Sequence, residues 1–213
     1  MCIRDREAGL RHILIGLESG REEALQRLNK KTTVEQNEKA LTILRSYGIE
    51  PNVGFIMFEP DSSVEDLRIN FEFLKRNHLL DNLDITVNVL YHHQIILQGT
   101  ESFRQLQAEG RLHITPYSAY EGHTPYQRLE VEAFAGCMRD ITNHIFSCMQ
   151  GIWSGRNQET KDAKERYHQV NSLLVQCFET LLEHLEKGFT LTVENNDIVA
   201  GTKQKIATIL SFT

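Results

Sequence analysis

GLESG at residues 16–20 and VGFIMFEP at residues 53–60 are the two stretches that decide the fold. Each one closes an apolar run, and the pattern of a helix follows each of them. In a parallel α/β fold, the loops at the carboxyl ends of the strands meet over one mouth, where ligands bind. The two stretches are therefore the first candidates for a ligand-binding site.

Strand and helix patterns alternate along the first half of the chain. Short apolar runs with β-branched residues predict strands, and apolar residues at i, i+3 and i+4 predict helices. Their alternation, with short connections, indicates a parallel sheet built by right-handed crossovers. The expected strands are 11–18, 50–58 and 83–90, and the expected helices are 21–29, 33–47, 63–78 and 101–109.

Side chains that cap helices set the expected helix starts. Thr33 with Gln36 has the spacing of a capping box. Gly48 follows the same helix in the C′ position, where a left-handed backbone suits glycine. The expected N-caps are Thr32 or Thr33, Asp61 or Ser62, and Thr100.

The second half of the chain has a different pattern. A connection rich in Pro, Tyr and His leads into two long amphipathic helices that are separated by a polar break. For the tail at 189–213 the sequence leaves two alternatives, which are a short strand pair and an irregular end with a helix at 202–211. The expected segments are the connection 113–127, helix 128–150, the break 151–162 and helix 163–187.

Composition places the chain among ordinary soluble globular proteins. It has 213 residues, of which 40% are hydrophobic and 24% charged, and a formal net charge of −6. That charge argues against a nucleic-acid partner, and no apolar stretch approaches the about 20 residues of a membrane helix. The start lacks the apolar segment of a signal peptide, so a cytoplasmic location is expected. Four scattered cysteines, Cys2, Cys137, Cys148 and Cys177, are interpreted as free thiols rather than as metal ligands.

The two stretches at the strand ends carry the chemistry. Glu18 offers a carboxylate and Ser19 a hydroxyl, which together suit an amine and a sugar hydroxyl, although Ser19 is equally suited to capping the next helix. Gly54, inside a strand, is typical of close approach by a ligand or by another backbone. The segment 55–58 can offer main-chain groups and apolar surface to a flat aromatic ring, or its side chains can simply pack against helices.

These motifs, in this order, resemble the second half of a radical S-adenosylmethionine (SAM) enzyme. The resemblance is carried by AGLRHILIGLESG at 8–20, by the stretch from LQRLNKK to EFLKR at 25–76, and by QGTESFRQLQAEGRL at 98–112. More narrowly, the resemblance is to the branch of that family whose members often carry a cobalamin-binding domain. The agreement of three segments in sequence is much more specific than any one of them.

The resemblance implies an α/β fold: the C-terminal part of a partial TIM-like (β/α) barrel with parallel strands, followed by an α-helical C-terminal region. It implies that Glu18 and Ser19 lie near the ribose and methionine parts of SAM. It implies that Gly54, Phe55 and Ile56 lie in the strand whose backbone contacts the adenine. The family's reaction is the reductive cleavage of SAM by a [4Fe–4S] cluster, and cobalamin is a further cofactor in this branch.

The chain departs from the family in its cysteines. The family's cluster motif, C-x3-C-x2-C, does not occur, so no metal ligands and no catalytic residues are assigned. Residues 1–6 are interpreted as a start foreign to the family, 7–112 as the C-terminal half of the barrel and 113–213 as the helical region. The expectation is an N-terminally truncated piece that retains part of a SAM pocket and is inactive by itself. Because its first strand has no earlier partner, the piece is also expected to self-associate.

Two other functions stay open from the sequence. One is a metal-independent hydrolase or isomerase that uses Glu18 with His92 or His93 for acid–base work. The other is a non-catalytic binding module that docks a partner through helices 128–150 and 163–187. The substrate, the oligomeric state and the use of cobalamin are not identified by the sequence.

Overall fold

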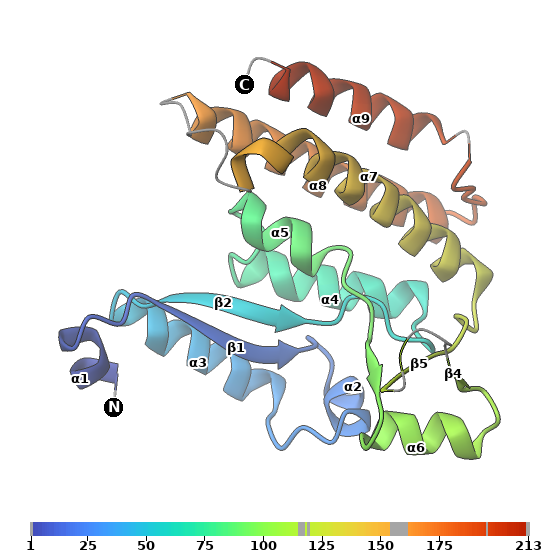
Figure 1. The fold of residues 1–213 in the computed structure, drawn as a ribbon, viewed down its shortest axis with the longest axis horizontal. Coiled ribbons are helices and arrows are strands. Elements are labelled where there is room, and N and C mark those ends of the chain that lie inside the picture. Colours follow the sequence, from blue (N-terminus) through green and yellow to red (C-terminus); the bar gives the residue numbers. More distant parts are fainter. Residues whose placement is uncertain (1, 115–117, 119, 154–161, 195, 212–213) are drawn as a thin grey trace.

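The computed structural model describes residues 2–114, 118, 120–153, 162–194 and 196–211. The expected polar break therefore lies largely outside the described residues. In the view of Figure 1, α3 lies below the parallel strand pair, and α4 and α5 lie above it. Helices α7, α8 and α9 lie further above, beyond α4 and α5. The elements are α1 Cys2–Glu7, β1 His12–Glu18, α2 Glu22–Arg27, α3 Val34–Ser46, β2 Glu50–Phe55, α4 Val64–Arg76, α5 Leu83–Val89, β3 Ile96–Leu97, α6 Glu101–Ala108, β4 His113–Ile114, β5 Glu121–His123, α7 Leu129–Trp153, α8 Ala163–Glu186 and α9 Asp197–Leu210.

The parallel pair of β1 and β2 carries both stretches that decided the fold. Gly16 is the register partner of Gly54, so the two motifs end side by side as expected. On one face, Leu17, Val53 and Phe55 are buried in the core together with residues of α3 and α4. The opposite face is open in the described residues, and it carries the two glycines.

Two of the three expected caps are confirmed, and one is corrected. Thr33 forms the predicted capping box with Gln36, and Thr100 caps α6. The cap of α4 is Ser63, which forms a capping box with Asp66, rather than Asp61 or Ser62. Ser62 is not free to cap because its buried hydroxyl accepts a hydrogen bond from the backbone N–H of Glu59.

The expected third strand at 83–90 is wrong, because this segment is helix α5. Its buried residues Leu83, Thr86, Val87 and Leu90 have the i, i+3, i+4, i+7 spacing of a helix, and the side chain of Asn82 caps it. Burial along one helical face outweighs the strand preference of its β-branched residues. Within the described residues, the second parallel pairing occurs further along the chain, as a single bridge between Phe58 and His93.

A small antiparallel sheet is formed by β3, β4 and β5, and the last two lie in the connection that was expected at 113–127. β5 pairs with β3 on one side and with β4 on the other. Beneath it, Ile96, Phe103 and Leu106 form a satellite core with Leu112. This sheet and α6 close off the carboxyl-terminal end of the strand pair (Figure 1).

The helical region shares one hydrophobic core with the strand pair. The tail forms helix α9 rather than a strand pair. The ring of Phe178 in α8 stacks on Phe71 of α4 with centroids 4.8 Å apart, and it meets Phe134 of α7 at the same separation. Phe134 in turn meets Phe58, just beyond β2, edge to face. The apolar stripes of α7 and α8 are therefore used inside this chain, and none of the described helices has the length and apolar character needed to cross a membrane.

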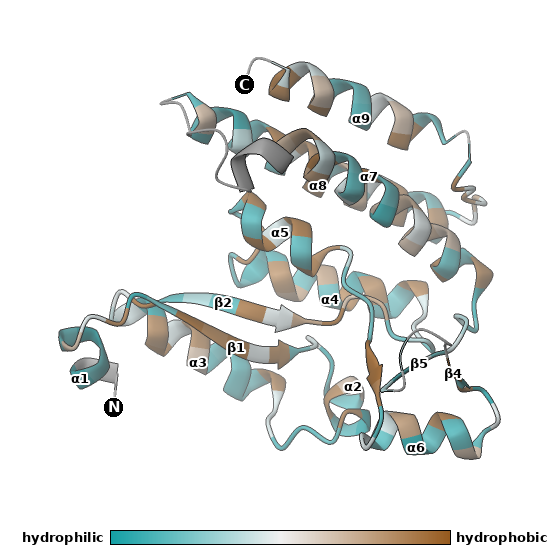
Figure 2. Ribbon diagram, in the orientation of Figure 1, coloured by the Kyte–Doolittle hydropathy of each residue, from teal (hydrophilic) through white to brown (hydrophobic). Residues whose placement is uncertain are grey.

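The outer edge of β1 predicts self-association. No described strand pairs with this edge, Figure 2 shows β1 as a largely apolar strand, and the side chain of Leu14 is 72% exposed. Leu14→Lys should weaken self-association about tenfold, because burial of a leucine contributes about 1.5–3 kcal/mol and an edge lysine opposes strand pairing. Sedimentation velocity over a concentration series measures the effect.

Ile43→Lys is the matched control for this prediction. Ile43 is also partly exposed, at 39%, but it lies on helix α3 away from the strand edge. If the unchanged chain is monomeric at all concentrations, or if both variants shift the association equally, the edge of β1 is not the contact.

Candidate functional site

The centre of the candidate site is a flat patch of backbone formed by Gly16 and Gly54 on the open face of the strand pair. A Cβ atom on Gly54 would lie 3.6 Å from the Cα of Gly16, 3.8 Å from the carbonyl oxygen of Ile15 and 3.9 Å from the Glu18 carboxylate. A Cβ atom on Gly16 would meet the Glu18 carboxylate at 2.5 Å. The missing side chain of Gly54 thus leaves the sheet backbone accessible there, whereas the Glu18 carboxylate and the Lys30 ammonium fill the space over Gly16.

Glu18 bends over this patch. A register shift between Gly16 and Glu18 interrupts the strand pairing, and Glu18 has a φ of 66°, in the left-handed region that favours glycine. Its carboxylate forms an ion pair with Lys30 at 2.8 Å, and the Lys30 ammonium also reaches the carbonyl oxygen of Gly16 at 3.4 Å. Non-glycine residues in this conformation gather at functional sites, where the surrounding structure holds them.

Ser19 lies on the other side of the sheet from the patch. Its side chain is fully buried, and its hydroxyl donates to Oδ1 of Asn70 at 3.0 Å and accepts from the N–H of Arg21. The same Asn70 oxygen accepts from the N–H of Gly20. The hydroxyl therefore fixes the turn that follows Glu18. The role of Asn70 was missed, and a polar residue among the apolar positions of helix 63–78 was the available signal.

Phe55 and Ile56 continue the strand beside Gly54. The side chain of Phe55 is buried and stacks on Phe73 at 5.8 Å, so only its backbone can face a ligand. The N–H of Ile56 donates to the carbonyl oxygen of Glu18 at 2.7 Å, and its side chain is half-buried. The structure thus brings Glu18, Gly54 and Ile56 together at the open face and turns the side chains of Ser19 and Phe55 into the core.

A buried charged cluster lies behind the loop that follows β2. Glu59 is 3% exposed, and its carboxylate contacts Arg27 at 2.7 Å and Arg21 at 4.0 Å. Arg21 also pairs with Asp66 at 2.7 Å. Burial opposes the charge of Arg27, but its hydrogen bond to Glu59 and nearby carboxylates together raise the pKa of the guanidinium.

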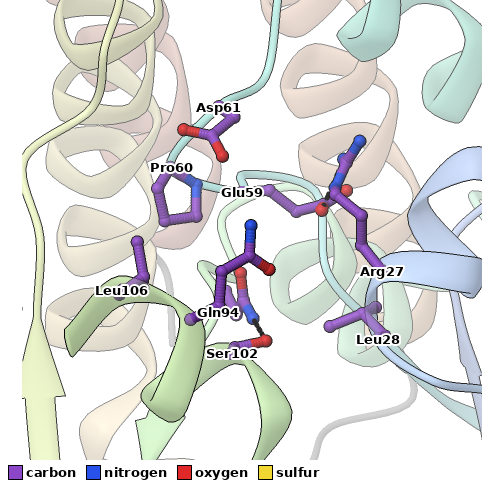
Figure 3. Close-up of a pocket in the computed structure, with 9 residues that line it drawn as sticks. Arg27, Leu28, Glu59, Pro60, Asp61, Gln94, Ser102 and Leu106 are labelled. Carbon is purple, nitrogen blue, oxygen red and sulfur yellow. Dashed lines mark hydrogen bonds and ion pairs between the residues drawn. The ribbon is translucent and has the colours of Figure 1, made fainter. Parts of the chain in front are cut away.

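This cluster borders the pocket drawn in Figure 3. The Glu59–Arg27 ion pair lies on one side of the pocket, and on another side the Gln94 side chain donates to the hydroxyl of Ser102 at 2.8 Å. The pocket thus joins α2, the loop after β2 and the start of α6. Sequence reasoning treated Glu59 only as a strand end, because a single glutamate beside a proline carries no signal of burial.

His92 and His93 do not complete an acid–base pair with Glu18. The carbonyl oxygen of His92 accepts from the backbone of Met57 and Phe58, and in the described residues Glu18 forms no hydrogen bond with either imidazole. Burial, the Arg139 guanidinium and His92 lower the pKa of His93, which lines a different cavity. The geometry therefore does not favour the hydrolase or isomerase alternative.

The cysteines whose side chains are described do not form a cluster site. Cys137, Cys148 and Cys177 are free, and burial raises the pKa of Cys137 to about 11. Within the described residues, no group of three or more His, Cys, Asp or Glu side chains is arranged to hold a metal ion. The described residues therefore do not fit an iron–sulfur cluster.

The class of protein follows from comparison with known families. Residues 4–74 match the family described as the Radical SAM superfamily. The chain is 40% identical, over 89 residues, to 4'-phospho-dehydrooxetanocin synthase from Priestia megaterium, a match that covers 39% of this chain and 12% of the relative. It is also 33% identical, over 70 residues, to the anaerobic magnesium-protoporphyrin IX monomethyl ester cyclase of Rubrivivax gelatinosus. That match covers 33% of this chain and 13% of the cyclase. The predicted resemblance to radical SAM enzymes is confirmed.

Comparison with solved structures specifies the fold more closely than the sequence matches do. The cobalamin-dependent radical SAM enzyme OxsB, with aqua-cobalamin bound, aligns with a TM-score of 0.70 over 97% of this chain and 38% of that structure, at 18% identity. OxsB with aqua-cobalamin and SAM bound aligns with a TM-score of 0.67 over 99% of this chain and 37% of the other. The fold is thus similar to that of part of OxsB, and the chain spans well under half the length of each of these proteins.

Proposed function

We propose that the open face of the β1–β2 pair binds the adenosine part of SAM. The observation that carries this proposal is the glycine patch of Gly16 and Gly54 beneath the Glu18 carboxylate. An adenine ring can lie flat against the backbone at Gly54, where a side chain is missing, and the neighbouring carboxylate is a strong acceptor for the two hydroxyls of a ribose. Lys30 holds the carboxylate over the patch and leaves part of it exposed to solvent.

The residues of the family pattern take different parts in this site. Glu18 is proposed to contact the ribose, and the backbone of Gly54, Phe55 and Ile56 the adenine. Ser19 is proposed to act indirectly, from the core side of the sheet. Its hydrogen bond to Asn70 fixes the turn after Glu18. We also propose that the strand part, 7–112, and the helical part, 113–213, are the two regions of this fold. A start foreign to the family at 1–6 is not proposed, because the family match begins at residue 4.

The reductive cleavage of SAM is proposed as the reaction of an enzyme that contains this chain together with cluster ligands. In radical SAM enzymes, the [4Fe–4S] cluster supplies the electron for that cleavage when it is bound. The described cysteines provide no such ligands, so the role proposed for these residues is to bind and orient SAM. Cobalamin is proposed as a further cofactor of the same enzyme, because the solved relatives contain it.

Gly54→Val should weaken SAM binding at least tenfold and leave the fold intact. Valine suits a strand, and a Cβ at this position makes only ordinary contacts, but its methyl groups occupy the place proposed for the ring. Isothermal titration calorimetry of SAM with the 213-residue chain measures the change. Glu18→Gln is the second variant and should weaken binding about tenfold, because hydrogen bonds to a charged acceptor contribute about 1.5–3 kcal/mol.

Gly201→Ala provides the control for this experiment. Gly201 lies in α9, where a Cβ would enter open space, so the substitution should not change SAM affinity. Absence of measurable SAM binding by the unchanged chain contradicts the proposal. Equal affinities of the unchanged chain and the Gly54 variant would also place the ligand elsewhere.

A further inference from the structure

A second cavity lies away from the glycine patch. Its volume is about 450 Å³, and its lining comes from the Phe58–His93 bridge, the β3–β5 pair, the segment before α7 and Arg139 within α7. Neither Gly16, Gly54 nor Glu18 lines it. We call it the Arg139 cavity. Its polar side chains are those of His93, Gln94, Glu121, His123, Thr124, Tyr126 and Arg139.

Arg139 is the cation of this cavity. It lies on α7, one residue beyond the buried Met138, and its side chain is exposed. Within the described residues it forms no ion pair, although many other arginines of the chain do, among them Arg27 and Arg68. Glu121, the carboxylate on the cavity lining, also forms no ion pair with it there. The guanidinium thus has its five N–H donors available to a ligand.

Hydrogen-bond donors accompany the cation. Burial raises the pKa of Tyr126 to about 12, so the phenol keeps its proton and remains a donor at neutral pH. Arg139 is close enough to act on both walls of the cavity: burial and the Arg139 charge lower the pKa of His93, and the same charge opposes part of the rise that burial causes in the pKa of Tyr126. His123 follows from β5, two residues after Glu121. The ring of Tyr126 is fixed edge to face on Phe58 at 6.4 Å, so the donor is held in place.

We propose that the Arg139 cavity binds an oxyanion group of a ligand, a phosphate or a carboxylate, with Arg139 as its charged anchor and Tyr126, His93 and His123 as hydrogen-bond donors. A planar guanidinium can engage two oxygens of such a group at once, and bonds of this kind are about twice as strong as neutral ones. The volume exceeds that of the oxyanion alone, so the anion is expected to be one end of a larger molecule. This site does not depend on SAM binding at the glycine patch.

The test is titration of the 213-residue chain with inorganic phosphate and, separately, with acetate. Binding is followed by the NMR signals of the His93 and His123 rings, whose environments should change on occupation. Arg139→Gln should weaken binding about tenfold or more, since a charge-assisted hydrogen bond is lost and Arg139 is exposed enough for the fold to be kept. Tyr126→Phe should weaken it about fivefold while it keeps the ring contact with Phe58.

Arg104→Gln is the matched control, because Arg104 is an exposed helical arginine that pairs with Glu101 outside the cavity. A preference for phosphate over acetate supports a phosphorylated ligand, and the reverse supports a carboxylate ligand. The proposal is overturned if neither anion shifts the two histidine signals, or if Arg139→Gln binds as well as Arg104→Gln. Gly54→Val should bind phosphate unchanged, so failure of the SAM proposal can be told apart from failure of this one.

Discussion

Phe178→Ala is expected to lower the free energy of unfolding by about 3–5 kcal/mol, the range for removal of a buried phenylalanine ring. The ring has no exposed surface and contacts Phe71 and Phe134, each with centroids 4.8 Å away, so the change leaves a hole where α4, α7 and α8 meet. The exposed ion pairs between α4 and α8, such as Lys75–Glu179, contribute too little to compensate. Urea denaturation followed by circular dichroism measures the loss.

The same substitution tests whether the strand region and the helical region unfold together. Because a single core joins them, hydrogen exchange of β2 and of α8 should be governed by the same opening free energy, and both should fall by the same amount in the variant. Phe189→Ala, which removes a ring that is 59% exposed, is the control and should cost less than about 1 kcal/mol. A loss confined to α8, or two separate urea transitions, would show that the regions are independent.

Glu59→Gln is expected to destabilise the fold by about 2–4 kcal/mol. Removing one partner of a buried ion pair leaves the other charge without compensation, which typically costs about 3–5 kcal/mol. Arg21 keeps Asp66 at 2.7 Å, and Arg27 reaches water because its side chain is 37% exposed, so the expected loss is somewhat smaller than that range. Thermal and urea unfolding of the variant give the value.

A double-mutant cycle separates the ion pair from the shape of the site. Adding Arg27→Gln to Glu59→Gln should recover part of the loss, because the uncompensated cation is then removed as well. Glu101→Gln breaks an exposed pair with Arg104 and should change stability by about 0.5 kcal/mol or less. If Glu59→Gln and Glu101→Gln cost the same, Glu59 is not a buried organiser of the loop after β2.

The strand pair could be predicted from the sequence because its signals come from residues that are close together in the chain. The apolar runs of β1 and β2, the Thr33–Gln36 capping box and the positive φ of Gly48 depend on residues a few positions apart. The third strand failed for the opposite reason. β-branched residues favoured a strand at 83–90, but burial of one helical face against α8 decided the outcome, and this depends on residues about ninety positions away.

The candidate site was only partly predictable for similar reasons. The motif GLESG pointed to Glu18, but whether a side chain turns toward the open face or the core is set by pairing with a distant strand. Ser19 turned inward because Asn70 of α4 lies beneath it. Arg139 and Tyr126 carried no motif, and only the packing of α7 against Phe58 brings them to one cavity.

The left-handed backbone at Glu18 has a consequence for engineering this chain. Glycine adopts such a φ freely, whereas other residues pay about 1 kcal/mol or more for it. A screen that rewards thermostability alone would therefore favour glycine at position 18 and discard the carboxylate above the patch. Libraries built on this scaffold should hold position 18 constant, or select for ligand affinity and heat resistance together.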